Sequence, residues 1–229
     1  MAYTFAAASS QYLSANASPL GTGQLADHTL AFWVRAANAA TTTLLAMSRS
    51  TETTSTNNPA ILVQINGDYL RYFMRANSSA TGVGWANLLG TSGAVVFNST
   101  WRHCVCRLSD SATVSTATTY VDGAQNQSVA YGSATPATTG LDRLGVCALV
   151  RGNVSSYSSA SVAEVGIWNV ALTAEEIASL GKGVSCDQVR SQSLVFYAPL
   201  VRNIGDMARG IALTNNNTAT VADHPRVYA

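Results

Sequence analysis

The spacing of apolar residues changes within one segment, residues 163–181, and this change predicts how the segment folds. Val165 and Ile167 fall two apart, which is the spacing of a β-strand with alternating faces. Further on, Ile177 and Leu180 fall three apart and lie on one face of a helix. The segment therefore predicts a strand, a sharp corner and a short helix that covers one end of a larger structure.

Local signals set the expected bounds of this helix at residues 173–181. Thr173 is suited to the N-cap position, and Glu176 three residues later completes a capping box. Gly181 is expected to end the helix.

Elsewhere the apolar residues form short runs with turn residues between them, which is the pattern of an all-β protein. The run Leu30–Val34 is nearly continuous and predicts a central strand covered on both faces. The other expected strands fall within 3–14, 44–47, 60–65, 68–75, 85–89, 101–108, 118–121, 126–129, 141–149, 163–170 and 193–201.

Two dipeptides predict tight hairpins. Asn66-Gly67 and Asp122-Gly123 each separate two strand-like runs, and both pairs suit the positive φ angles of a type I′ turn. After the first turn, Arg71, Phe73 and Arg75 alternate with aliphatic and other residues. One face of that strand is therefore expected to be aromatic and cationic.

Four stretches of sequence, taken in order, resemble one family. They are His28–Arg35, Thr100–Cys106, Thr119–Gly123 and the closing motif Glu164–Ile177, in which a strand runs into an Ala-Leu-Thr-x-x-Glu-Ile helix. This order is similar to that of laminin-G-like, concanavalin-A-type lectin and glucanase domains, and the match extends over about residues 10–181. The resemblance implies an all-β fold, a two-sheet antiparallel jelly-roll sandwich with one short helix near 173–181.

The same resemblance divides the chain into two parts. Residues 1–201 are expected to form the jelly-roll domain, with the strong strand at 193–201 returning to it. Residues 202–229 form a C-terminal extension that packs on this domain or on a neighbouring subunit. The sequence leaves both arrangements open.

The charge content excludes several functional classes. Only 11% of the 229 residues are charged and the formal net charge is +1, which argues against a nucleic-acid-binding protein. No apolar stretch reaches the roughly 20 residues of a membrane-spanning helix. The N-terminal residues have no basic segment before an apolar one, so we expect synthesis in a host cytoplasm without a signal peptide.

The four cysteines are interpreted as small buried hydrophobic residues. Cys104 and Cys106 are two apart on an expected strand and point to one face, where a disulfide between them would be strained. A bridge between Cys147 and Cys186 is the alternative, and it would require an oxidising compartment.

Catalytic patterns are missing from the sequence. Glucanases of this fold use clustered carboxylates, whereas here Glu176 is assigned to capping, Glu175 to solvent, and Glu164 stands alone on its strand. The three histidines have no ligand or base partner at a suitable spacing and are interpreted as structural; they are His28, His103 and His224. We therefore expect a non-enzymatic protein. A relative of the glucanases that has lost its catalytic residues is a further alternative to the two hypotheses given below.

Recognition of sugars is the chemistry that the remaining residues favour. Aromatic rings stack on the apolar faces of sugars and amides pair with hydroxyls, so the candidate glycan-binding residues are Tyr72, Trp85, Asn87 and Tyr157. The alternative is that Tyr72 and Trp85 belong to the core. No cofactor is expected, and calcium is left open as an unassigned alternative. Calcium would need converging oxygens, and the candidate aspartates are explained as turn residues, so no metal site is assigned. These turn residues are Asp68, Asp110, Asp122 and Asp142.

Two functional hypotheses follow. The first is a structural or adhesion protein on a virion surface, a capsid decoration or tail-associated protein of a bacteriophage, because the surface is poor in charge and no export signal is seen. Its partners would be other virion proteins, copies of itself and host cell-surface glycans, with no nucleic acid and no membrane insertion. The second is a soluble carbohydrate-binding, lectin-like module.

Overall fold

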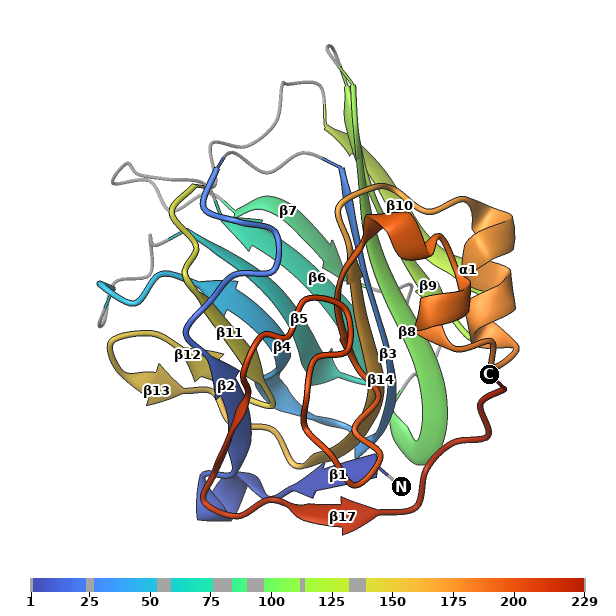
Figure 1. The fold of residues 1–229 in the computed structure, drawn as a ribbon. Coiled ribbons are helices and arrows are strands. Elements are labelled where there is room, and N and C mark those ends of the chain that lie inside the picture. Colours follow the sequence, from blue (N-terminus) through green and yellow to red (C-terminus); the bar gives the residue numbers. More distant parts are fainter. Residues whose placement is uncertain are drawn as a thin grey trace.

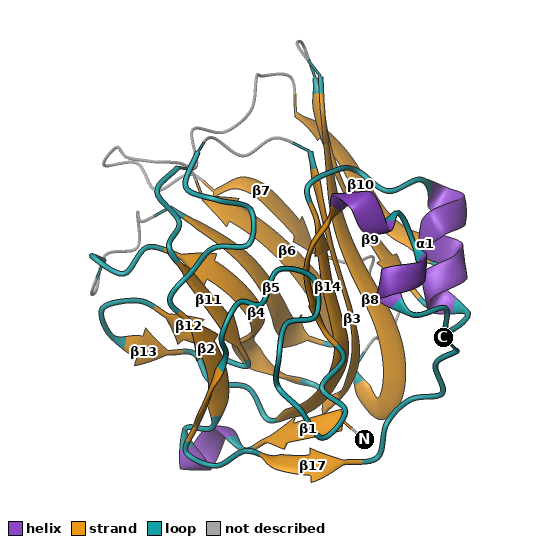
Figure 2. Cartoon of the chain, in the orientation of Figure 1, coloured by secondary structure: helices purple, strands orange, loops and turns teal. Residues whose placement is uncertain are grey.

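The structure of the chain is a computed structural model, shown in Figure 1. It describes residues 2–23, 27–52, 59–75, 84–89, 97–111, 114–131 and 139–228, with the backbone alone at 84–89 and at 131. Two β-sheets lie face to face, and the helix α1 (Ala174–Gly181) lies on the outside of one of them, as Figure 2 shows. The expected two-sheet antiparallel sandwich is confirmed.

The first sheet, called sheet A below, carries the outer helix. Its strand order is β10 (Ala124–Tyr131), β9 (Ser115–Val121), β8 (Asn98–Asp110), β3 (His28–Ala37), β14 (Ala160–Trp168), β1 (Ala2–Phe5) and β17 (Thr220–Ala222). A further strand, β15 (Leu194–Ala198), pairs with the C-terminal half of β14, from Val165 to Trp168. The neighbouring strands in this sheet are antiparallel.

The second sheet, sheet B, covers the opposite side of the core. Its order is β16 (Thr214–Asn216), β2 (Tyr12–Ala15), β11 (Arg143–Val146), β4 (Ala39–Ser48), β5 (Ala60–Gly67), β6 (Tyr69–Arg75) and β7 (Gly84–Leu89). A small hairpin is formed by β12 (Leu149–Val150) and β13 (Val154–Ser155). The helical elements are α1 (Ala174–Gly181) and the 3₁₀ turns η1 (Ala7–Ser9), η2 (Cys186–Gln188) and η3 (Ser191–Ser193).

The main core lies between the sheets and follows from strand alternation. Leu30, Phe32 and Val34 of β3 point inward and join Cys104 and Cys106 of β8 in one buried cluster. Successive side chains of a strand point to opposite faces, so the residues between them face outward. This alternation decides which side chains of sheet A are available to a ligand.

All four cysteines are buried and free, as the sequence predicts for small apolar residues. Cys147 belongs to the main core and Cys186 to a separate cluster around α1. The alternative of a Cys147–Cys186 bridge is therefore wrong. Burial raises the pKa of each of these thiols, which keeps them in the uncharged form.

Helix α1 packs on the outer face of sheet A and begins as expected. The Thr173 hydroxyl accepts from the Glu176 amide, and the Glu176 carboxylate accepts from the Thr173 amide at 2.7 Å, so the capping box is confirmed. Ile177 and Leu180 are buried against Trp168 in the second cluster. The helix therefore covers one end of this sheet face.

The end of the helix differs from the expectation. Gly181 is the last helical residue, and the left-handed glycine that follows is Gly183, with a φ of 95°. Gly181 has another role, because a Cβ atom there would lie 2.5 Å from the backbone nitrogen of Gly123. The helix thus rests directly on the β9–β10 turn.

One of the two expected hairpin turns is displaced by one residue. Asn66 pairs with Tyr69, so the turn residues are Gly67 and Asp68, and Gly67 alone has a positive φ. This is the pattern of a type II′ turn. The predicted turn at Asp122-Gly123 is confirmed, since both residues have a positive φ.

The C-terminal extension pairs with its own domain in this structure. Strand β17 pairs with β1 at the edge of sheet A, and β16 pairs with β2 at the edge of sheet B. Beyond them, Tyr228 forms a bridge with Val184 after α1. The extension therefore adds one edge strand to each sheet.

Candidate functional site

The outer face of sheet A is open at the end away from α1. Trp33 and Arg35 of β3 alternate with the inward residues Phe32 and Val34, so they point to this outer face. Both side chains are partly exposed. Trp101 of β8, paired with Arg35, is partly exposed as well.

One residue from each of five neighbouring strands forms a straight row across this face. Residues that are directly paired in a sheet point to the same side. The strand register joins Thr220, Thr4, Ser161, Arg35 and Trp101, from β17, β1, β14, β3 and β8 in turn. We call these five residues the cross-strand row.

Aromatic rings and a guanidinium lie at one end of the row. The guanidinium carbon of Arg35 lies 5.3 Å from the centroid of the Trp101 ring. The Trp33 ring is tilted against His103, with 5.2 Å between ring centroids. These contacts hold the side chains against the sheet, so their positions are set before any ligand arrives.

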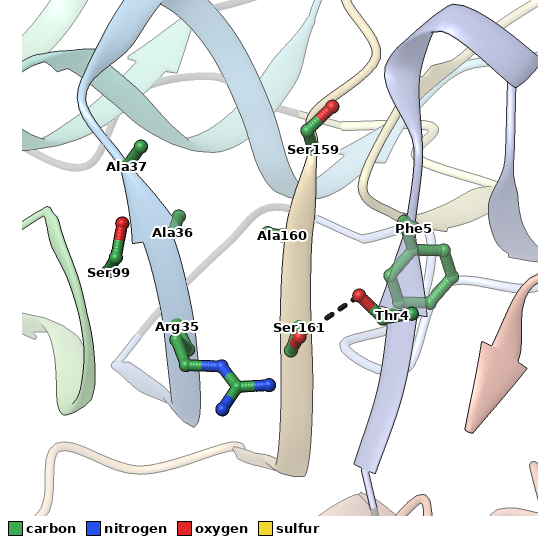
Figure 3. Close-up of a pocket in the computed structure, with 9 residues that line it drawn as sticks. All are labelled: Thr4, Phe5, Arg35, Ala36, Ala37, Ser99, Ser159, Ala160 and Ser161. Carbon is green, nitrogen blue, oxygen red and sulfur yellow. Dashed lines mark hydrogen bonds between the residues drawn. The ribbon is translucent and has the colours of Figure 1, made fainter. Parts of the chain in front are cut away.

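A cavity of about 340 Å³ lies beside Thr4, Ser161 and Arg35 of the row, at the ends of β1, β3 and β14, as drawn in Figure 3. Its polar lining comes from Arg35 and from four hydroxyl side chains, and alanines with Phe5 make up the rest. The hydroxyl residues are Thr4, Ser99, Ser159 and Ser161. No carboxylate is among the described residues that line this cavity.

Hydrogen bonds within the cavity leave donors for a ligand. The Ser161 hydroxyl donates to Thr4 Oγ1 at 3.0 Å, and the Ala7 amide donates to Ser159 Oγ at 3.0 Å. Thr4 and Ser159 act as acceptors in these bonds, so each keeps its own hydroxyl hydrogen. The cavity therefore offers hydroxyl and guanidinium donors side by side.

His103 lies under this face as a neutral ring. It is buried, and burial lowers its pKa to about 4, although the nearby Asp122 carboxylate acts in the opposite direction. Its Nδ1 atom has no hydrogen-bond partner among the described residues. The local positive charge at neutral pH thus comes from arginines and not from this histidine.

Tyr72, one of the residues predicted from sequence, is not on the surface. Its exposed fraction is 0%, and its hydroxyl lies 2.6 Å from His28 Nε2. The second strand of the hairpin turns this residue toward the core, together with Leu70 and Met74. The expectation that Tyr72 contacts a glycan is therefore wrong, and the alternative of a core residue is confirmed for it.

The other three sequence candidates are not members of the cross-strand row. Trp85 and Asn87 belong to β7 of sheet B, and their side chains fall outside the described residues; the backbone register pairs Asn87 with Phe73. Tyr157 is partly exposed and packs on Tyr12, with ring centroids 5.9 Å apart. A role for these three in glycan binding stays a prediction.

Glu164 is the one carboxylate on β14, and it is held by residues distant in sequence. It is buried at a bulge of β14 with a φ of 53°, and its Oε2 accepts from the Tyr197 hydroxyl at 2.6 Å. Its Oε1 lies 3.2 Å from His224 Nε2 without an aligned hydrogen bond. These residues line a second cavity of about 490 Å³, between β14 and the C-terminal extension.

Sequence analysis missed the cross-strand row for an identifiable reason. The run Leu30–Val34 was interpreted as covered on both faces, but α1 covers only one end of the sheet. The alternation of Trp33 and Arg35 with Phe32 and Val34 was the available signal. The other residues of the row lie on strands that are distant in sequence, so no local pattern links them to Arg35.

A two-sheet antiparallel sandwich with tryptophan rings, a guanidinium and hydroxyls on one sheet face has the architecture of lectin-type β-sandwich domains. The family model described as the concanavalin A-like lectin/glucanases superfamily matches residues 7–178. The chain therefore belongs to this superfamily, and the resemblance of its motifs is confirmed. No curated protein matches the chain in sequence.

Solved structures share the fold at low sequence identity. The CBM40 of Ruminococcus gnavus IT-sialidase, bound to α2,3 sialyllactose, is 12% identical with a TM-score of 0.57, covering 69% of this chain and 84% of its own. A proposed carbohydrate-binding protein of Bacteroides ovatus is 14% identical with a TM-score of 0.64, covering 96% and 61%. The heptameric SAP-like pentraxin of Limulus polyphemus is 11% identical with a TM-score of 0.54, covering 92% and 87%.

His103 should make the protein less stable as the pH falls from about 6.5 to about 4. Its folded-state pKa is below the ordinary value, so the unfolded chain binds the proton more readily and acid favours unfolding. The full shift corresponds to about 3 kcal/mol. Urea unfolding of the protein and of His103→Leu across this pH range should give a steeper loss for the unchanged protein. Equal slopes would contradict the assignment.

Proposed function

We propose that the protein is a non-catalytic carbohydrate-binding domain of the lectin type, and that it binds a glycan along the cross-strand row. The observation that carries this proposal is the presence of Trp33, Arg35 and Trp101, all partly exposed, on the same open sheet face as a row of hydroxyls. The sugar bound in the Ruminococcus gnavus CBM40 supports a glycan as ligand for a domain of this fold.

The residue types suit the two chemical sides of a sugar. A tryptophan ring covers the apolar C–H face of a pyranose, while guanidinium and hydroxyl groups bond to its hydroxyls. The groups are carried by hydrogen-bonded strands, so little conformational entropy is lost when a ligand binds. In Figure 3 Arg35 and Ser161 reach the same cavity from neighbouring strands.

Binding without cleavage is the second part of the proposal. Glycoside hydrolysis generally uses two carboxyl groups on either side of the bond. Glu164 is buried and accepts from the Tyr197 hydroxyl, and Glu176 is engaged by the capping box and by Arg190 at 2.8 Å. Among the described residues, no three histidine, cysteine or acidic side chains form a group that could hold a metal ion.

A glycan array, followed by calorimetry on the best ligand, tests the proposal. Trp101→Ala should weaken binding at least about tenfold, which is about 1.4 kcal/mol, because a stacking surface is lost. Tyr157→Ala serves as the control and should change the affinity less than about twofold. Binding should persist in chelator.

Two results would contradict the proposal. One is the absence of binding to any glycan on the array. The other is a loss of binding in Tyr157→Ala with none in Trp101→Ala, which would move the site to the sequence-predicted residue.

A role on a virion surface remains the second proposal. It is favoured by exposed apolar side chains on the C-terminal extension, which suggest a contact with another subunit. These are Met207, Val221 and Tyr228, each between 52% and 70% exposed. Mass spectrometry of purified phage particles should find the chain at a fixed copy number; its absence from washed particles would remove this proposal.

In the described chain no helix is long and apolar enough to cross a membrane.

A further inference from the structure

Arg35 is the charged centre of the cross-strand row. Its guanidinium has no carboxylate within ion-pair distance among the described residues, in contrast with Arg102, which lies 2.7 Å from Asp122. One face of the guanidinium is against Trp101, and the side chain extends toward Ser161 in Figure 3. Its N–H groups therefore remain at the cavity, where they can bond to a ligand.

The groups around Arg35 do not offset its charge. From β14 and β1 it is faced by the hydroxyls of Ser161 and Thr4, and from β8 by the Trp101 ring and the Ser99 hydroxyl. Hydroxyls are dipoles without net charge. The cavity beside the row is therefore positive at neutral pH.

A neutral glycan laid over this position would carry a cost. Its hydroxyls could accept from the guanidinium, but they would displace water without supplying a countercharge, which is less favourable for the charged group than pairing with an anion. A carboxylate or sulfate removes this cost, because a guanidinium binds such groups through two parallel hydrogen bonds. The geometry favours an anionic group at Arg35 over a hydroxyl.

The length of the row bears on the shape of the ligand. Neighbouring strands are about 4.8 Å apart, so five residues extend over about 19 Å. One strand spacing is close to the length of one pyranose unit in an extended chain. A linear chain that crosses the strands could therefore place successive units over successive residues of the row.

We infer that the ligand is a linear acidic oligosaccharide, with a carboxylate or sulfate bound by Arg35 next to the unit that stacks on Trp101. This inference rests on the proposed glycan-binding function and gives that site its ligand class. The hydroxyls of Thr4 and Thr220 then contact the units on the other side of the charged one, and the buried Ser161 hydroxyl positions Thr4.

The test uses matched pairs of immobilised oligosaccharides, each an acidic chain and its neutral parent of equal length. One set carries uronic acids and a second carries sulfate esters, so that the two sources of the anion are separated. The protein should bind the acidic member of at least one pair about tenfold more tightly than its parent. The preference should fall as the salt concentration rises, since the interaction is between charges.

Variants locate the preference on Arg35. Arg35→Gln should weaken binding to the acidic chain about tenfold more than binding to its neutral parent, so that the preference is lost, and Arg35→Lys should keep part of it. The matched control is Arg143→Gln, which removes an arginine of sheet B that is paired with Asp142. It should leave the preference unchanged, and circular dichroism verifies that each variant is folded.

The outcomes separate the inference from the function on which it rests. Equal binding of acidic and neutral chains, reduced by Trp101→Ala, would overturn the acidic ligand and leave the glycan-binding function in place. An acidic preference that survives Arg35→Gln would overturn the role of Arg35. Absence of binding to every chain would overturn both proposals.

Discussion

The packing of Trp168 across sheet A determines which part of the molecule can meet a ligand. Its ring is fully buried, and its indole N–H donates to the Val189 carbonyl at 2.8 Å. Gly166 leaves room for the ring, since a Cβ atom there would lie 2.6 Å from it. Ile177 and Leu180 of α1 complete this cluster. The cover ends there, so the other half of the same sheet face stays open to solvent.

Local chemistry made much of the fold predictable. The capping box of Thr173 and Glu176 and the turn at Asp122-Gly123 depend on a few adjacent residues, and both are confirmed. The turn after β5 shifted by one residue because the pairing of Ile65 with Leu70 buries both side chains in the core. When a turn sequence permits two strand registers, the strands adopt the register that buries their apolar side chains.

The candidate site could not be predicted in the same way. Its row takes one residue from each of five strands, and the positions run from Thr4 to Thr220. No spacing along the chain connects them; only the strand order does. Tyr72 illustrates the converse error, because its ring type suggested sugar binding while its position in the alternation placed it in the core.

The most direct test of the account is to titrate the ¹⁵N-labelled protein with a glycan that binds on the array. The indole N–H signals are followed in ¹H–¹⁵N correlation spectra during the titration. The chain has four tryptophans, so four indole signals can be assigned by substitution. We expect Trp33 and Trp101 to shift with added glycan and the buried Trp168 to stay unchanged. A shift confined to Trp85 would place the glycan on sheet B and contradict the account.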